Sequence, residues 1–360
     1  MIEIDVLPAS EKQSADAILL RIGSFSYDNP ENNDQKVILI DSGWQSAAEK
    51  IENHLDDYYY TDTIDYVFIT HPDRDHISGL LELLENKNIK ISRTFIHDPW
   101  NYKNKLLKRS KDGRRTINSI DSRLDENLDI LSRILDLLDE RKIINNEIFG
   151  VSDSDKFGLS ELGLYVLGPS KDDYVQLLSE FPGIDEERNT SNKSVYTDKE
   201  FDYNPSFRHF LSNPVTSAKN DSSMIILLHN NKKEPIALFT GDAGVESIYK
   251  ALKEAEYEEL EYKNVALMQL PHHGSIKNIN QDIIDSINPR KIFVSASDED
   301  NEHPSKLVVN YIINKGIPIK HISSSGGIVY YFDGAENRPG WYPAPNMRAF
   351  TKVQKIKEGC

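Results

Sequence analysis

The chain has 360 residues, and its 42 Lys and Arg against 58 Asp and Glu give a net charge of −16. This acidic balance disfavours tight nonspecific binding of nucleic acid, which depends on neutralising phosphates with Lys and Arg. No segment approaches the roughly 18 consecutive apolar residues of a membrane span, so we expect no membrane insertion. The lone Cys360 excludes an internal disulfide. Such cysteine usage is compatible with a reducing compartment, so we expect a cytoplasmic protein.

The first part of the chain alternates between strand-like and helix-like patterns. The order then breaks at residues 98–150, where a basic and helical insertion is expected. Before that point, strands are predicted near residues 2–7, 16–23, 36–40, 65–70 and 91–96, and helices near residues 45–56 and 77–86.

Residues 116–143 of the insertion carry apolar side chains at three- and four-residue steps. The spacing predicts an amphipathic helix of about seven turns if it is unbroken. We expect this helix to pack in the core of the insertion, and a homodimer contact is the weaker alternative. The apolar positions are Ile117, Ile120, Leu124, Leu128, Leu131, Leu135 and Leu138.

Downstream of the insertion, a strand is predicted at residues 162–167 and a helix at residues 172–180. Residues 182–219 are polar with little periodicity, which predicts a long loop. Strands and helices then alternate to residue 331, and residues 333–360 are expected to form an irregular C-terminal arm.

One short segment carries more chemical information than any other. His71, Asp73, Asp75 and His76 directly follow a buried strand-like run, so we expect all four side chains on the loop before the next helix. Such groups, gathered in one place, would repel one another and lose hydration, and a divalent cation removes that cost. The segment therefore predicts a metal site, with a solvated acidic loop as the alternative.

Later strand-like runs are also followed by metal-ligand side chains. Asp242, His272, His273 and His303 each come soon after such a run. Each has an ordinary explanation in a turn, but α/β enzymes assemble their sites from residues at strand ends. Their recurrence in one order indicates a shared site. Such a set could hold two metals, the arrangement used for hydrolytic displacement at phosphorus or carbonyl carbon.

The order of these motifs resembles the metallo-β-lactamase fold, and most closely the ComEC-type hydrolase domain in a free-standing form. The resemblance covers residues 1–332 and implies the α+β class, as a four-layer αβ/βα sandwich with the insertion at residues 98–150. The motifs that carry it are His71-x-Asp73-x-Asp75-His76, Thr240-Gly241-Asp242, Pro271-His272-His273-Gly274-Ser275 and His303-Pro304, supported by Asp41-Ser42-Gly43, Asn220-Asp221-Ser222-Ser223 and Gly326-Gly327.

Two positions depart from the commonest pattern of this fold. Asp73 stands where most members have His, and residues 220–223 stand where most supply a further His. His209 lies upstream and could substitute, although we do not favour it. The resemblance then implies one well-furnished metal position and one poorer position. The first would use Asp75, His76, Asp242 and His273, and the second His71, Asp73 and the shared Asp242.

These ligands imply one or two divalent ions and a hydrolytic mechanism. Oxygen-rich ligation makes Mn²⁺ a credible occupant alongside Zn²⁺. A water between two ions would lose a proton near neutral pH and attack in line, with Asp75 holding a metal and orienting that hydroxide. His272 and His303 would protonate a leaving oxygen or donate hydrogen bonds to a phosphate. Which of His272, His273 and His303 are ligands stays open, although the resemblance favours His273.

Candidate substrate-binding residues lie in a polar turn and in a basic run. The basic run is most simply a solvated face, but it could guide a phosphate backbone toward the metals. Trp100 and Tyr102 beside it could stack a base or anchor the loop. The candidates are Ser222, Ser223, Lys108, Arg109, Arg114 and Arg115.

We therefore expect a metal-dependent hydrolase, and favour a phosphodiesterase or nuclease that acts on DNA, RNA or a nucleotide. One alternative is a small-molecule hydrolase, acting on a phosphocholine ester, a nucleotide or a lactone, because this fold serves many substrates. The other is a catalytically weak regulatory member of the fold.

Overall fold

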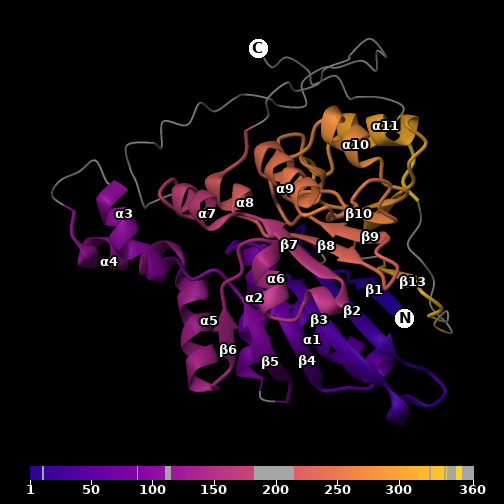
Figure 1. The fold of residues 1–360 in the computed structure, drawn as a ribbon, viewed down its shortest axis with the longest axis horizontal. Helices are drawn as coiled ribbons and strands as arrows, with labels where there is room; N and C mark the ends of the chain where they lie inside the picture. Colours follow the sequence, from indigo (N-terminus) through magenta and orange to yellow (C-terminus); the bar gives the residue numbers. More distant parts are fainter. Residues whose placement is uncertain are drawn as a thin grey trace.

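The computed structural model describes residues 1–9, 12–86, 88–109, 115–181, 215–323, 326–335, 338 and 346–350. Two sheets carry helices on their outer faces, so the expected α+β class is confirmed (Figure 1). His209, Arg114, most of the predicted loop at 182–219 and most of the predicted arm at 333–360 lie outside the described residues.

The first sheet has seven strands in the order β13-β1-β2-β3-β4-β5-β6. The pairs from β13 to β3 are antiparallel, and those from β3 to β6 are parallel. The strands are β1 (Ile2–Val6), β2 (Ala17–Ser24), β3 (Asp34–Ser42), β4 (Thr63–Phe68), β5 (Lys90–Phe95), β6 (Ile144–Asn146) and β13 (Ile328–Phe332).

The second sheet has six strands in the order β12-β11-β10-β9-β8-β7. The pairs from β9 to β12 are parallel, so the carboxyl ends of these strands share one edge. The strands are β7 (Leu164–Gly168), β8 (Ile225–His229), β9 (Pro235–Phe239), β10 (Leu267–Gln269), β11 (Ile292–Ser295) and β12 (Ile319–Ile322).

Three apolar clusters separate four layers. One lies between the first sheet and helices α1 (Ala47–His54), α2 (Arg74–Glu85) and α5 (Asp129–Glu140). The second lies between the two sheets. The third lies between the second sheet and helices α9 (Val245–Tyr257), α10 (Gln281–Ile287) and α11 (Lys306–Asn314). The expected αβ/βα sandwich is therefore confirmed.

Short helices complete the description. Within the described ranges, no helix is both long and apolar enough to cross a membrane. The α-helices are α3 (Lys103–Arg109), α4 (Ile117–Asn127), α6 (Val151–Lys156), α7 (Lys171–Leu178) and α8 (Ala218–Asp221). Single turns of 3₁₀- or π-helix lie at Pro30–Asn32, Leu55–Tyr59, Pro99–Tyr102, Ser160–Leu162 and His272–Gly274.

The segment predicted to be helical over residues 116–143 forms two helices, so the length of about seven turns, expected if it were unbroken, is not reached. Leu128 separates α4 from α5 with φ −130° and ψ 39°. Its N–H still donates to Leu124 O, and its carbonyl accepts from Ser132 N–H. The apolar stripe therefore continues across the break, so the spacing of apolar residues in the sequence does not reveal where α4 ends and α5 begins. Most of the apolar positions are buried within the chain, and α5 packs against α2.

Two aromatic residues hold separate segments of the insertion together. Trp100 Nε1 donates to Asp125, and the buried Tyr102 donates its hydroxyl to Glu147. The sequence left two roles open for these rings, stacking a base or anchoring the loop, and the contacts are those of anchors. Strand β6, which was not predicted, then pairs with β5 and ties the end of the insertion to the first sheet.

Helix α2 begins earlier than predicted. It starts at Arg74 with Asp73 as its N-cap, so Asp75 and His76 lie in the first helical turn and not on a loop. The helix macrodipole favours a carboxylate at this end. This position also fixes both side chains on a rigid element.

Gly79 allows α2 to approach the end of β3. Its N–H donates to Gly43 O at 2.9 Å, and a Cβ at this position would lie 2.0 Å from Ser42 O. The Ser42 hydroxyl donates to His76 O and accepts from Leu80 N–H. The turn of α2 that carries His76 is therefore locked onto the first sheet.

We expect Gly79→Ala to destabilise the protein by about 1–3 kcal/mol, because the added methyl group must displace α2 from β3. Gly326→Ala is the matched control, since a Cβ there meets nothing within 4 Å. Denaturant unfolding of both variants measures the difference. Equal unfolding free energies would contradict the close approach described for Gly79.

Candidate metal centre

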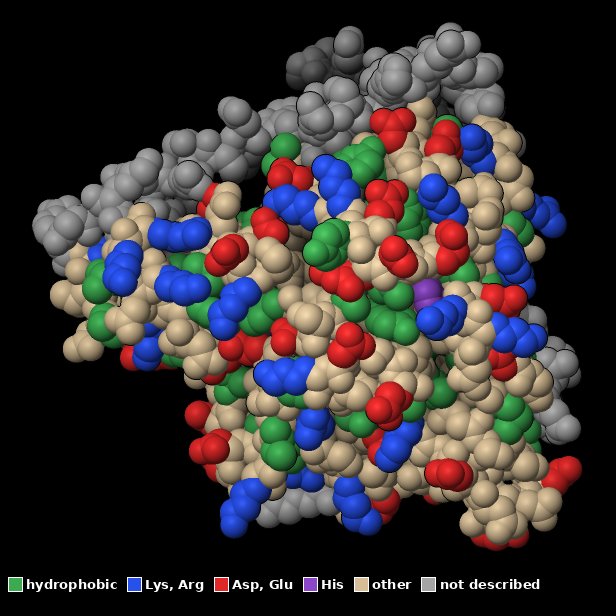
Figure 2. Space-filling model, viewed as in Figure 1, with side chains coloured by type: hydrophobic (Ala, Val, Ile, Leu, Met, Phe, Trp, Pro, Cys, Tyr) green, Lys and Arg blue, Asp and Glu red, His purple; other side chains and the backbone are tan. Residues whose placement is uncertain are grey.

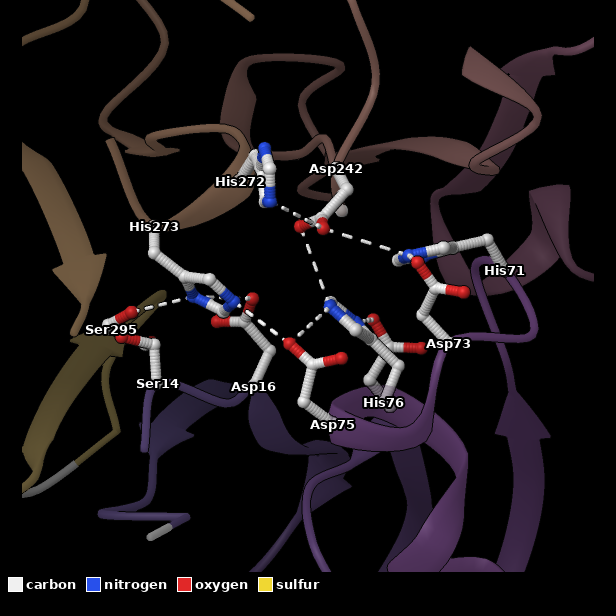
Figure 3. Close-up of polar contacts among 12 residues, drawn as sticks. Ser14, Asp16, His71, Asp73, Asp75, His76, Asp242, His272, His273 and Ser295 are labelled. Atoms are coloured by element: carbon white, nitrogen blue, oxygen red, sulfur yellow. Dashed lines mark hydrogen bonds and ion pairs between the residues drawn. The ribbon is translucent and has the colours of Figure 1, made fainter. Parts of the chain in front are cut away.

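The ends of several strands bring the predicted metal ligands into one cluster (Figure 3). Both sheets contribute, so the cluster forms where the carboxyl ends of their parallel strands meet. The contributing segments are the β4–α2 connection (His71 and Asp73), the first turn of α2 (Asp75 and His76), the β9–α9 turn (Asp242) and the turn after β10 (His272 and His273).

The buried carboxylate of Asp41, at the end of β3, orients two of these imidazoles. Asp41 accepts hydrogen bonds from Thr70 N–H and Thr70 Oγ1–H, both at 2.8 Å, and its Oδ2 lies 2.8 Å from His76 Nδ1. Because Thr70 gives its hydroxyl proton to Asp41, its oxygen is left to accept from His71 Nδ1, at 3.1 Å. Both rings therefore turn Nε2 toward the cluster.

Several of the atoms that face the cluster lack a hydrogen bond. His71 Nε2, His76 Nε2 and Asp242 Oδ1 are buried and make no hydrogen bond among the described residues. Leaving a buried polar atom unpaired costs free energy. Metal-ligating histidines characteristically bond their other nitrogen to a carboxylate or carbonyl, as His76 does here. These atoms therefore fit a divalent ion.

The inner half of the cluster surrounds one oxygen of Asp242. Two ligands at about 2.0–2.1 Å from a tetrahedral ion lie about 3.3 Å apart. Asp242 Oδ1 is 3.4 Å from His76 Nε2, which is 3.6 Å from Asp75 Oδ2. His273 Nε2 lies 3.0 Å from Asp75 Oδ2, while His273 Nδ1 faces Ser295 O at 2.7 Å. These spacings match ligands around one ion.

The outer half surrounds the other oxygen of the same carboxylate. Asp242 Oδ2 is 3.5 Å from His71 Nε2 and 3.6 Å from His272 Nε2. Asp73 Oδ2 lies 3.6 Å from His71 Nε2. Asp242 therefore stands between two groups of potential ligands, and Figure 3 shows the imidazoles on either side of it.

Asp16 is a potential ligand that the sequence analysis missed. Asp16 forms a buried set with His76, Asp242 and His273. Each of the four residues offers one ligand atom, and these atoms all lie within 4.8 Å of one another. Its burial raises the pKa of the Asp16 carboxyl. The only signal in the sequence is a single charge placed directly before the apolar strand β2.

The carboxylates of the cluster stabilise the protonated form of two of its imidazoles, His76 and His273. Burial would lower the pKa of His273, but its hydrogen bond with Asp75 and the nearby carboxylates outweigh burial and raise this pKa to about 9. Burial also opposes protonation of His76, yet three neighbouring carboxylates raise its pKa well above the ordinary value. A divalent ion would displace these protons, because metal binding requires neutral imidazole.

His272 and His303, the two histidines predicted to act on the substrate, lie at different distances from Asp242. His272 directs Nε2 toward Asp242, so its geometry is that of a ligand candidate. His303 lies at the rim, with its ring centroid 5.2 Å from that of His272, and its Nδ1 is 3.1 Å from Asp300. Burial and the neighbouring imidazoles of His272 and His273 lower the pKa of His303.

The predicted substrate-binding serines are buried. Ser223 accepts from Asp242 N–H at 3.1 Å, and the Ser222 hydroxyl donates to Lys219 O at 2.6 Å. Their hydroxyls therefore bond to the protein itself, and Ser223 positions the Asp242 turn.

The predicted basic residues lie on the insertion. Lys108 and Arg109 are exposed at the end of α3, a helix that packs on α4 and α7. Lys and Arg side chains gather toward this end of the face in Figure 2, interspersed elsewhere with acidic ones. Arg115 is half-buried just before α4. Closer to the metal ligands, Lys219 places its Nζ 3.2 Å from Asp73 Oδ1, a contact that the sequence did not predict.

Four layers with a cluster of metal-ligand side chains at the strand ends define a class, the metallo-beta-lactamase fold. Residues 31–126, less than half of the chain, match the family model described as the metallo-beta-lactamase superfamily. These residues, which span β3 to α4, are thus similar to this superfamily. No curated protein matches the chain.

Similar solved structures share low sequence identity with the chain. A HARLDQ-motif mutant of a metallo-beta-lactamase from Cronobacter sakazakii is 18% identical with a TM-score of 0.18, covering 28% of this chain and 33% of its own. A Thermotoga maritima protein described as a metallo-beta-lactamase is 13% identical with a TM-score of 0.35, covering 74% and 94%. The long form of RNase Z from yeast is 14% identical with a TM-score of 0.31, covering 82% and 37%. The chain thus spans about a third of the first of these proteins.

We expect Asp41→Asn to lower the affinity for Zn²⁺ or Mn²⁺ by about 10–100-fold, as loss of an outer-shell partner typically does. The amide cannot accept all three of the hydrogen bonds that orient His71 and His76. Calorimetric titration of EDTA-treated protein measures the affinity, and thermal unfolding without metal checks the fold. Asp62→Asn is the control, because Asp62 is an exposed carboxylate paired with Lys90. Equal affinities in all three proteins would refute the role of Asp41.

Proposed function

We propose that this protein is a metal-dependent phosphodiesterase. The observation that carries the proposal is the convergence of buried imidazole Nε2 atoms, which make no hydrogen bond, on the two oxygens of Asp242. The ComEC-type resemblance in the motifs supports a phosphodiester as the substrate.

The inner half would hold the more tightly bound ion. Its ligands would be Asp75, His76, Asp242 and His273, with the buried Asp16 as an additional carboxylate. The outer half, with His71, Asp73 and His272, would be the weaker position. A divalent ion bound here lowers the pKa of a water and polarises a phosphoryl oxygen. Three carboxylates in the inner half favour Mn²⁺, while the imidazoles also suit Zn²⁺.

The side chains of the cluster would then orient the attack and manage its protons. Asp75 is partly exposed at 23%, so its carboxylate can accept a hydrogen bond from the attacking water. This bond would point a lone pair of the water oxygen at phosphorus. A P–O bond forms to the water oxygen as the P–O bond to the leaving alcohol breaks. The water loses a proton as it attacks and the leaving oxygen gains one; His303, at the rim, is placed to take up the first and deliver it to the second.

The first test combines a substrate panel with one substitution. We expect Mn²⁺-supported cleavage of at least one of single-stranded DNA, double-stranded DNA, plasmid, mononucleotide or bis(p-nitrophenyl) phosphate. Asp75→Asn should reduce kcat by about 100-fold or more, in the range of a lost proton-transfer or water-orienting group. Asp172→Asn, an exposed carboxylate on α7, is the control. Full activity of Asp75→Asn would rule out this mechanism, and no turnover of the panel with either metal would rule out the function.

A second test separates a nucleic acid from a small diester as the substrate. We expect reversal of Lys108, Arg109, Arg114 and Arg115 to Glu to reduce DNA or RNA cleavage by at least tenfold, because contacts to several phosphates are lost. Hydrolysis of bis(p-nitrophenyl) phosphate should stay within about twofold, since that substrate is too short to span the basic run.

The matched control for this test reverses four exposed lysines elsewhere, Lys232, Lys233, Lys253 and Lys263. It keeps the same change in net charge without touching the insertion. Equal effects of the two quadruple variants on nucleic acid cleavage would favour a small-molecule hydrolase, the alternative substrate class.

A further inference from the structure

Lys219 brings an ammonium group to the outer half of the cluster. Its Nζ lies 3.2 Å from Asp73 Oδ1, and the two side chains are 19% and 33% exposed. The pair is thus open to solvent on one side and faces the ligand atoms on the other, where Asp73 Oδ2 lies 3.6 Å from His71 Nε2. A surface ion pair of this kind contributes little to stability. Its position beside the ligand atoms of the outer half therefore suggests a role in binding more than a role in folding.

The short helix that carries Lys219 is fixed to the turn that carries Asp242. Asp221, two residues along α8, accepts hydrogen bonds from Gly244 N–H at 3.0 Å and from the Ser247 hydroxyl at 3.1 Å. The carbonyl of Lys219 accepts from Ser222. The backbone of Lys219 is therefore held in a defined place relative to the cluster, which leaves only its side chain to adapt to a ligand.

The two halves of the cluster differ in the charge that they offer an ion. The inner half has Asp16 and Asp75 besides the shared Asp242. In the outer half, the shared carboxylate is joined by Asp73, whose charge Lys219 offsets at 3.2 Å. Opposite charges at this separation attract each other, which reduces the net negative charge that Asp73 presents to a cation. The ammonium therefore weakens the attraction of the outer half for a second cation.

We propose that Lys219 supplies at the outer half the positive charge that a second metal ion would otherwise supply, and that it binds an anionic oxygen of the substrate phosphate there. This inference rests on the proposed function. Lys219 releases Asp73 or shares its donors between the carboxylate and the phosphate, since an ammonium group has three N–H donors. The protein then works with one tightly bound ion and one lysine.

The test measures phosphate binding without turnover. The Mn²⁺-loaded protein is titrated with inorganic phosphate, and Lys219→Met should weaken its affinity by at least tenfold. Lys219→Arg, which keeps the charge, should stay within about threefold of the wild-type affinity. Lys250→Met is the matched control, because Lys250 also pairs with an aspartate, Asp173 at 2.7 Å, but on the outer helix α9. Unchanged affinity in Lys219→Met overturns the proposal.

Metal content gives a second, independent readout. Wild-type protein should bind one Mn²⁺ tightly, and Lys219→Met should bind the second ion at least tenfold more tightly than wild type does. Two equally tight ions in the wild type would overturn the proposal. If Lys219→Met unfolds, Lys219→Gln replaces it, and thermal unfolding identifies the variant to use. Phosphate binding without hydrolysis of any diester would count against the proposed function while supporting the role of Lys219.

Discussion

The carboxylate of Asp41 couples the end of β3 to the end of β4 and fixes the half of the cluster that the first sheet supplies. It has no exposure to solvent, and it accepts hydrogen bonds from the backbone and hydroxyl of Thr70 and from His76. A buried carboxylate is tolerated only when its lone pairs are occupied in this way. The same bonds orient the rings of His71 and His76, so one interaction serves both the packing of the fold and the presentation of the ligand atoms.

The second sheet supplies its half of the cluster through backbone conformation. His272 and His273 both have positive φ, 47° and 53°, which is unfavourable for residues with a Cβ. The turn is held by backbone bonds from His272 N–H to Gly241 O and from Ser305 N–H to Gly274 O. Strain of this kind persists where the surroundings determine the conformation, and such places cluster at functional sites. Here it directs two consecutive imidazoles to different carboxylates of the cluster, His272 to Asp242 and His273 to Asp75.

Much of this arrangement could be predicted from the sequence, because strand ends and metal-ligand side chains follow one another in the chain. His71, Asp75, His76 and Asp242 each come directly after an apolar run, and parallel strands bring such ends to one edge. Asp16 was missed because one acidic residue before a strand has no distinguishing pattern. The break at Leu128 was hidden because the apolar stripe continues on both sides of it. Contacts such as that of Lys219 with Asp73 join distant segments, and no local pattern encodes them.

The acidity of the chain and the chemistry proposed for it act at different distances. A net charge of −16 repels a polyanion from afar, but salt screens that repulsion beyond about 8 Å at physiological ionic strength. At the cluster, the local charges decide: the ammonium of Lys219 lies 3.2 Å from the carboxylate of Asp73, and a divalent ion would add further positive charge there. An acidic surface is therefore compatible with a phosphate-binding site of this kind, and it favours substrates of low charge over long nucleic acids. A cationic surface such as the α3 end of the insertion would reverse that preference, so under the proposed function we expect the insertion, and not the metal cluster, to decide between a nucleic acid and a small diester.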